Sequence, residues 1–212
     1  MEKATQFRQT DVLLIVGQRG SGKTILGKYL TRSFANKMRT FIFDPMAEFQ
    51  IGYGKVVYNL SEINLEEDKH IVYNPIKNDS IDEIELYDQI CKFVWEKMPN
   101  TLFVTDELHN YESKALTRYY RKLITQGRHR NIGMIGISQR YALLNQTTIT
   151  QSSHIFIFRL IGRDIEVSRQ YFGAEIEPLL RNLQEYHFIH FDTRKQGYEL
   201  KKPISSEIAK NL

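Results

Sequence analysis

Short runs of apolar residues recur along the chain, and the stretches between them alternate apolar and polar positions with helical spacing. Val12–Val16 is apolar at every position, which is typical of a strand buried on both faces of a parallel sheet. Similar runs predict strands at 40–43, 56–58, 70–73, 102–105, 132–138 and 154–160. The stretches 186–191 and 198–200 predict a closing pair of strands.

Helical periodicity fills most of the gaps between these strands. A helix is predicted over 23–35 by the spacing of Leu26, Leu30 and Phe34. Ser80 and Glu83 have the spacing of a capping box, which predicts a second helix to about residue 97. Further helices are predicted near 113–126, 165–171 and 177–183.

Strands that alternate with helices predict an α/β fold. We expect a mainly parallel central sheet flanked by helices, with antiparallel strands at its C-terminal edge. We find no internal repeat and no linker in the sequence, so we expect residues 1–212 to form a single domain.

Composition limits where the protein works. The single cysteine, Cys91, cannot form an internal disulfide, which favours a reducing compartment. The longest apolar runs have the length of strands and are far shorter than the roughly 20 residues that span a bilayer. The N-terminus has no apolar signal core. We therefore expect a soluble protein of the cell interior.

The charge is unevenly distributed. The net charge is +4, yet residues 113–163 contain no Asp or Glu. That segment carries seven arginines and two lysines: Lys114, Arg118, Arg121, Lys122, Arg128, Arg130, Arg140, Arg159 and Arg163. A solvated helix surface is one explanation. Because surfaces usually mix both signs and arginine suits phosphate, we favour contact with a polyanion or a triphosphate.

The segment after the first strand matches the phosphate-binding loop G-x-x-x-x-G-K-[ST], with a strand before it and a helix after it. Glycines allow successive backbone N–H groups to face an anion at a helix N-terminus. We expect Lys23 to reach the β- and γ-phosphates and the Thr24 hydroxyl to bind Mg²⁺. The residues expected to bind nucleotide are Gly17, Gln18, Arg19, Gly20, Ser21, Gly22, Lys23, Thr24 and Ile25.

Two carboxylates end the predicted strand at 102–105. In a parallel sheet this end lies beside the phosphate loop. We expect Asp106 to hold Mg²⁺ and Glu107 to take a proton from the attacking water, a role that a simple nucleotide switch does not need. Gln139, at the end of the next predicted strand, would orient that water. The sequence therefore predicts an ATPase that uses Mg²⁺.

Three further expectations are weaker. Arg128, or else Arg130, would supply a guanidinium to the developing charge, although contact with a DNA backbone is an alternative. Asp44 and Glu48 would approach the nucleotide or form only a turn. We place the nucleotide base near 192–197.

Four segments together resemble the FtsK–HerA superfamily of DNA-pumping ATPases. They are the phosphate loop, Phe43-Asp44-Pro45-Met46-Ala47-Glu48-Phe49, Asp106-Glu107-Leu108-His109, and the stretch from Gly127-Arg128 through Gly133-Met134-Ile135-Gly136-Ile137-Ser138-Gln139-Arg140. The resemblance implies a RecA-like P-loop NTPase fold. It also implies Glu107 as the catalytic base, Gln139 as the polar sensor, and Arg128 as a finger that reaches the next subunit of a homo-oligomeric ring, a hexamer.

The sequence lacks the membrane anchor, N-terminal barrel and C-terminal DNA-reading domain of the cellular members. In this it is similar to the genome-packaging ATPases of tailless icosahedral viruses with an internal membrane, above all those of Sulfolobus turreted icosahedral viruses. The resemblance implies a double-stranded DNA translocase that fills a procapsid, with capsid or membrane-vertex proteins as partners and a place in the host cell or the virion. A cellular HerA-like helicase motor, a small-molecule P-loop kinase and a non-enzymatic nucleotide-switched assembly protein remain alternatives.

Overall fold

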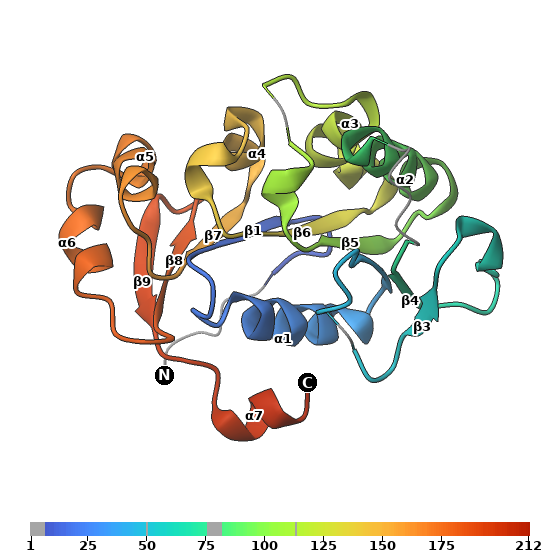
Figure 1. Cartoon of the computed structure of the whole chain (residues 1–212), viewed down its shortest axis with the longest axis horizontal. Coiled ribbons are helices and arrows are strands. Elements are labelled where there is room, and N and C mark those ends of the chain that lie inside the picture. The colour runs from blue at the N-terminus through green and yellow to red at the C-terminus, as the bar shows by residue number, and fades with distance from the viewer. Residues whose placement is uncertain (1–6, 50, 76–81, 113) are drawn as a thin grey trace.

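The protein is built around one twisted sheet (Figure 1). The computed structural model describes residues 7–49, 51–75, 82–112 and 114–212. The nine strands within these residues lie in the order β3-β4-β2-β5-β6-β1-β7-β8-β9. They are β1 Val12–Val16, β2 Arg39–Phe43, β3 Lys55–Val57, β4 His70–Tyr73, β5 Thr101–Thr105, β6 Gly133–Ser138, β7 His154–Ile157, β8 Phe188–Asp192 and β9 Gly197–Lys201.

The first seven strands are parallel, and β8 and β9 join them antiparallel. This arrangement confirms the predicted α/β fold with antiparallel strands at the C-terminal edge. Strand β1 pairs with β6 on one side and β7 on the other. The carboxyl ends of β1, β5 and β6 therefore lie along the same edge, called here the carboxyl edge.

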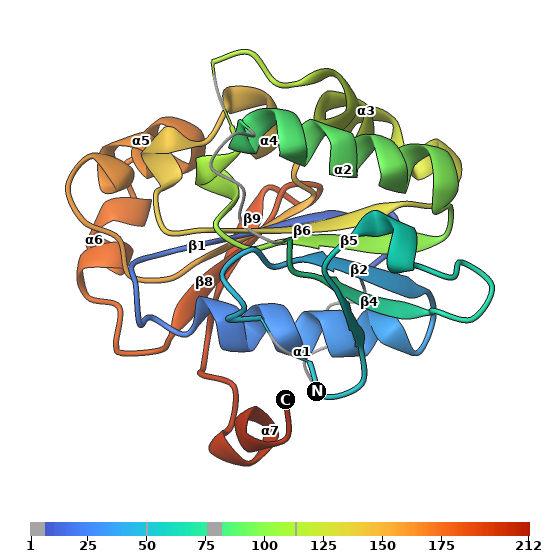
Figure 2. The same ribbon diagram turned by 45° about the vertical axis from the view of Figure 1, so that its right-hand side comes forward.

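Helices cover both faces of the sheet (Figure 1, Figure 2). One face carries α1, Lys23–Ala35, with the C-terminal helix α7, Ser206–Lys210, beyond it. The other carries α2 Glu83–Lys97, α3 Arg118–Gln126, α4 Gln146–Gln151 and α5 Arg163–Phe172, with α6 Ile176–Arg181 at the β9 side. Among the described residues, none of these helices combines the length and apolar character needed to cross a membrane.

The alternation of side chains along β1 explains why every position of this strand is apolar. Leu13 and Ile15 belong to the core cluster that contains the apolar residues of α1. Leu14 and Val16 belong to the cluster on the opposite face, beneath α2 and α3. Because successive side chains of a strand point to opposite faces, a sheet covered on both sides buries all of them.

Several predicted boundaries need correction. The predicted strand at 154–160 ends at Ile157, because Arg159 leaves the sheet ladder and its carbonyl accepts the N–H of Gln18 in the phosphate loop. The predicted cap Ser80 lies outside the described residues, and α2 is capped by Asp82, which accepts N–H groups of its first turn. The helices α4 and α7 are not apparent from periodicity, since each has only one or two turns.

The predicted helix near 113–126 begins at Arg118. Its first turn is held by Asp88 of α2, whose Oδ1 accepts the N–H groups of Tyr119 at 2.7 Å and Tyr120 at 3.2 Å. A carboxylate at a helix N-terminus satisfies otherwise unpaired donors and opposes the helix dipole. The start of this helix is therefore set by a contact between residues distant in sequence.

Candidate nucleotide-binding site

The loop from β1 to α1 has the backbone that an anion-binding loop requires. Gly20 and Gly22 have φ of 76° and 102°, in the left-handed region that favours glycine. Gly17 packs so closely on Phe158 that an added Cβ would lie 2.5 Å from the Cβ of that residue. The first turn of α1 has no acidic residue and no side-chain cap. Its N–H groups therefore remain available to an anion.

Lys23 and Ser21 lie inside this loop. Lys23 is buried, and its Nζ donates to the carbonyl of Gln18 at 2.8 Å. Burial lowers the Lys23 pKa, and the charges of Glu107 and Asp106 act to raise it. The buried Ser21 hydroxyl has no hydrogen-bond partner among the described residues. An ammonium group and an unpaired hydroxyl at a helix N-terminus fit the oxygens of a phosphate chain.

Asp106 is a buried carboxylate at the carboxyl edge, directly after β5. Burial is the main cause that raises its pKa to about 6; the neighbouring charges of Glu107 and Asp44 raise it further, against a backbone N–H bond from Glu107 and the charge of Lys23. The buried Asp106 carboxylate beside the phosphate loop fits a divalent cation, which prefers oxygen ligands. Thr24, half-buried at the start of α1, adds a hydroxyl.

Glu107 is held by residues from two adjacent strands. The side-chain amide of Gln139, just after β6, donates to Glu107 Oε1. On its other side, His109 Nδ1 lies 3.5 Å from Glu107 Oε2 and 3.3 Å from the Ser138 hydroxyl. The backbone of Glu107 is itself left-handed, with φ 52°, a conformation that side-chain-bearing residues rarely adopt. Burial lowers the pKa of His109, and the Glu107 carboxylate opposes this shift.

His109 contacts Glu107, and the sequence analysis assigned it no role. The only available signal was its spacing, two residues after Glu107, in a short turn that brings it back to the carboxylate.

Asp44 shapes the turn after β2. Its two carboxylate oxygens accept the N–H groups of Glu48 at 3.0 Å and Phe49 at 2.8 Å. Burial raises the Asp44 pKa despite these bonds. Asp44 therefore holds the expected turn, and its charge also acts on Asp106. Glu48 is exposed.

The two candidate arginines lie at the opposite edge of the sheet. Both belong to a short turn, Gly127–Arg130, that precedes β6. Since β6 is parallel to β1 and six residues long, it separates this turn from the phosphate loop by about 20 Å. Arg128 is exposed, and its guanidinium has no hydrogen bond or ion pair with the residues that the structure describes. Arg130 is anchored: its guanidinium lies 5.6 Å from the Trp95 ring and donates to the Glu96 carbonyl.

The turn at 192–197 does not contact the phosphate loop, so our placement of the base there is wrong. Because β8 is antiparallel to β7, it starts at the carboxyl edge and ends at the opposite one. There Arg194 pairs with Asp11, the residue before β1, at 3.2 Å.

The basic residues of α3 have acidic neighbours that the sequence did not reveal. Arg118 and Arg121 are exposed, and the Lys122 ammonium lies 5.1 Å from the Tyr119 ring centroid and 5.5 Å from that of Trp95. The Tyr119 hydroxyl donates to Glu96 of α2. Helix α3, which has no acidic residue of its own, thus packs against α2, and α2 supplies the carboxylates of Asp88 and Glu96.

Comparison with known proteins identifies a family for this chain. The sequence matches the family of the poxvirus A32 protein over residues 3–182, a range that includes the phosphate loop, Asp106, Glu107 and Gln139. The chain belongs to the poxvirus A32 protein family. This A32-family chain is also 23% identical over 209 residues to the DNA packaging ATPase P9 of Enterobacteria phage PRD1, covering 91% of this chain and 86% of P9.

Solved structures share the fold of this A32-family chain. The genome packaging NTPase B204 of Sulfolobus turreted icosahedral virus 2, in complex with ATP-γS, superposes with a TM-score of 0.80 at 21% identity, covering 94% of this chain and all of B204. VirB4 of Thermoanaerobacter pseudethanolicus gives a TM-score of 0.74 at 11% identity, covering 98% and 93% of the two chains. These similarities confirm the P-loop NTPase fold and the resemblance to Sulfolobus virus packaging ATPases.

Proposed function

We propose that this chain hydrolyses ATP to move double-stranded DNA into a viral procapsid. The observation that carries the proposal is the meeting of Lys23, Asp106, Glu107 and Gln139 at one edge of the sheet, in a chain of the A32 family. The similarity to a DNA packaging ATPase and to a packaging NTPase solved with ATP-γS supports ATP as the nucleotide and DNA as the substrate.

Each residue has a distinct task in this proposal. The N–H groups of loop 17–24 and the Lys23 ammonium bind the phosphate chain. Thr24 and Asp106 would hold Mg²⁺, which when bound neutralises negative charge on the phosphates. Glu107 accepts the proton of the attacking water. Gln139, whose amide contacts Glu107, orients both the carboxylate and the water.

The motor acts as a ring in this proposal. Residues 1–212 form one motor domain, six copies assemble, and Arg128 of each copy serves the nucleotide of its neighbour. The basic residues of α3, together with Lys114, contact DNA phosphates, which need no sequence code. Capsid or membrane-vertex proteins dock the ring at the procapsid inside the host cell; association with the finished virion is the alternative place.

ATP turnover with and without long double-stranded DNA tests the proposal. We expect DNA to stimulate phosphate release. A chain that binds ATP without turnover, with or without DNA, would instead be a nucleotide-switched assembly protein, and phosphate transfer to a metabolite would indicate a kinase.

Lys23→Ala is expected to weaken ATP binding about 10- to 100-fold, because one charge-assisted contact to phosphate is lost. Titration calorimetry with ATP measures the change. Lys37→Ala removes an exposed lysine beyond the far end of α1 and serves as the matched control. Equal affinities of the two variants for ATP would place the phosphates elsewhere.

Arg118→Gln, Arg121→Gln and Lys122→Gln combined should weaken binding to DNA of every sequence. Each lost phosphate contact should lower the slope of log affinity against log salt by about 0.9. The control variant removes three positive charges elsewhere, at Arg181, Lys195 and Lys210, all exposed. A slope that stays unchanged in the α3 variant, or falls equally in the control, would remove α3 from the DNA contact. Fluorescence anisotropy of labelled duplex DNA gives both slopes.

A further inference from the structure

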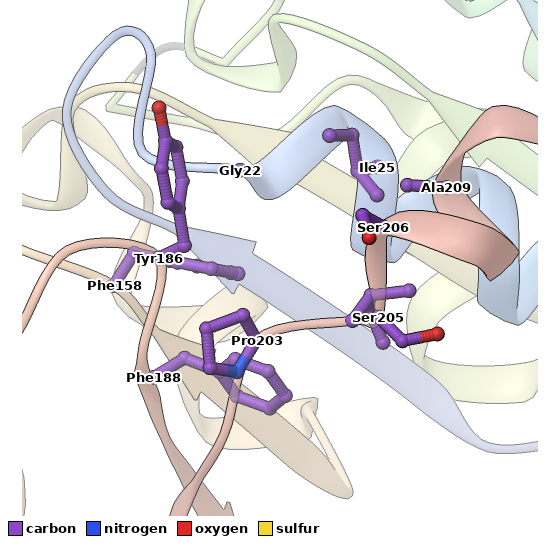
Figure 3. Close-up of a pocket in the computed structure, with 10 residues that line it drawn as sticks. Gly22, Ile25, Phe158, Tyr186, Phe188, Pro203, Ser205, Ser206 and Ala209 are labelled. Atoms are coloured by element: carbon purple, nitrogen blue, oxygen red, sulfur yellow. The ribbon is translucent and has the colours of Figure 1, made fainter.

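An apolar pocket of about 440 Å³ lies next to the phosphate loop (Figure 3). Gly22 and Ile25, at the start of α1, form one side. Phe158, Tyr186 and Phe188, from the ends of β7 and β8 at the carboxyl edge, form the second. The C-terminal segment 203–209 closes the third side.

Tyr186 is held against the phosphate loop by an unusual backbone. Its φ is 61°, in the left-handed region, which is a genuine outlier for a bulky residue. The ring stands beside Gly22 (Figure 3), and a Cβ at Gly22 would lie 3.4 Å from Cδ1 of Tyr186 and 3.4 Å from Cε1 of Phe158. Backbone strain of this kind concentrates at functional sites, where the rest of the fold maintains it.

We propose that this pocket receives the base of the nucleoside triphosphate, held by apolar and stacking contacts. The inference rests on the proposed function, since the phosphates in the loop determine where the base lies. Gly22 belongs to both the phosphate loop and the pocket wall, so a nucleotide with its phosphates on the loop can reach the pocket without a gap. The pocket volume lies within the range of small-molecule sites.

The pocket lining indicates which nucleotides it accepts. Apart from the Tyr186 hydroxyl, its polar side chains are those of Ser205 and Ser206, and Ser205 Oγ already accepts the N–H of Ile208 as the cap of α7. A site that reads a base by hydrogen bonds rejects the wrong base strongly, whereas an apolar pocket discriminates weakly. Stacking is tolerant because every base presents a π-face. ATP and GTP should therefore bind with affinities within about tenfold of each other.

The outer wall of the pocket is lightly packed. The helix α7 has five residues and none of them is buried. The residue that follows α7 is joined to α1 by a hydrogen bond from the Arg32 guanidinium to the Asn211 carbonyl. A bound base would add contacts to segment 203–209, which should then exchange its amide hydrogens more slowly. Tripolyphosphate, which has no base, should leave that exchange unchanged.

Ala209→Trp tests the pocket by filling it. We expect this variant to lose about 10- to 100-fold in ATP affinity and to bind tripolyphosphate as the unaltered chain does. Lys210→Trp places the same side chain at the next, exposed position and should change neither affinity. Titration calorimetry measures both ligands, and circular dichroism confirms that the variants are folded.

Tyr186→Asn is a second variant that keeps the left-handed backbone accessible, because Asn tolerates it. It should also weaken ATP binding selectively. Unchanged ATP affinity in both variants, or an equal loss for tripolyphosphate, would refute the base pocket. GTP binding weaker than ATP binding by clearly more than the expected factor of about ten would refute stacking as the mode of recognition. An unaltered chain that binds neither ATP nor tripolyphosphate would refute the proposed function itself.

Discussion

Glu107→Gln should bind ATP as tightly as the unaltered chain and hydrolyse it about 10² to 10⁴ times more slowly. The amide preserves the size and shape of the side chain but cannot accept the proton of the attacking water. Its oxygen can still accept the hydrogen bond from Gln139, so the local geometry should persist. Phosphate release under single-turnover conditions measures the loss, and calorimetry measures the binding.

The matched control is Glu67→Gln, which removes an exposed carboxylate far along the chain from the site. Its turnover should equal that of the unaltered chain. Hydrolysis by Glu107→Gln within a few-fold of normal would show that another group takes the proton.

Arg128→Ala should lower turnover by about 10³ to 10⁵ in assembled rings and leave ATP binding intact. Arg128 and its own phosphate loop lie at opposite edges of the sheet, so this exposed arginine cannot serve the nucleotide of its own chain. A neighbouring chain can present it. Turnover of purified rings, with their size checked by light scattering, gives the effect.

Mixing two inactive variants distinguishes action in trans from a general defect. Arg128→Ala retains a functional phosphate loop but lacks the arginine that would serve the neighbouring chain. Lys23→Ala retains that arginine but has an inactive phosphate loop. In the proposed ring the contacts would run head to tail, so that at equal mixing ratio about a quarter of the interfaces would join a functional phosphate loop to a functional arginine finger. Activity above both parents supports the trans finger.

A ring that hydrolyses ATP only when all its sites are functional would not show this recovery of activity. Dilution of the unaltered chain with Lys23→Ala serves as the control. If that activity falls linearly while the variant mixture stays inactive, Arg128 is not the trans finger. Arg130 then has to leave its position over the Trp95 ring to serve that role.

The strands and the phosphate site could be predicted because their signals are local. Val12–Val16 is apolar throughout, and the glycine-rich loop follows it directly. The parallel sheet then brings the ends of β5 and β6 beside that loop, which is why Glu107 and Gln139 could be paired from sequence. Short apolar runs followed by polar residues carry most of this information.

The remaining features depend on contacts between residues distant in sequence. The start of α3 is set by Asp88, about thirty residues earlier. The pocket combines Gly22, Tyr186 and the segment 203–209, which share no motif. The turn at 192–197 was misplaced although its antiparallel strands were predicted, because the reversal of β8 sends that turn to the opposite edge.

Because β1 lies between β6 and β7, the phosphate loop that follows β1 has different strands on its two sides. Strands β5 and β6 bring the carboxylates and Gln139 to one side of the loop, and β7 and β8 bring the apolar pocket to the other. If the pocket receives the base as we propose, substitutions in the last quarter of the sequence change which nucleotide is preferred without moving the groups around the phosphates. Nucleotide preference and hydrolytic chemistry would then vary independently of each other in related chains.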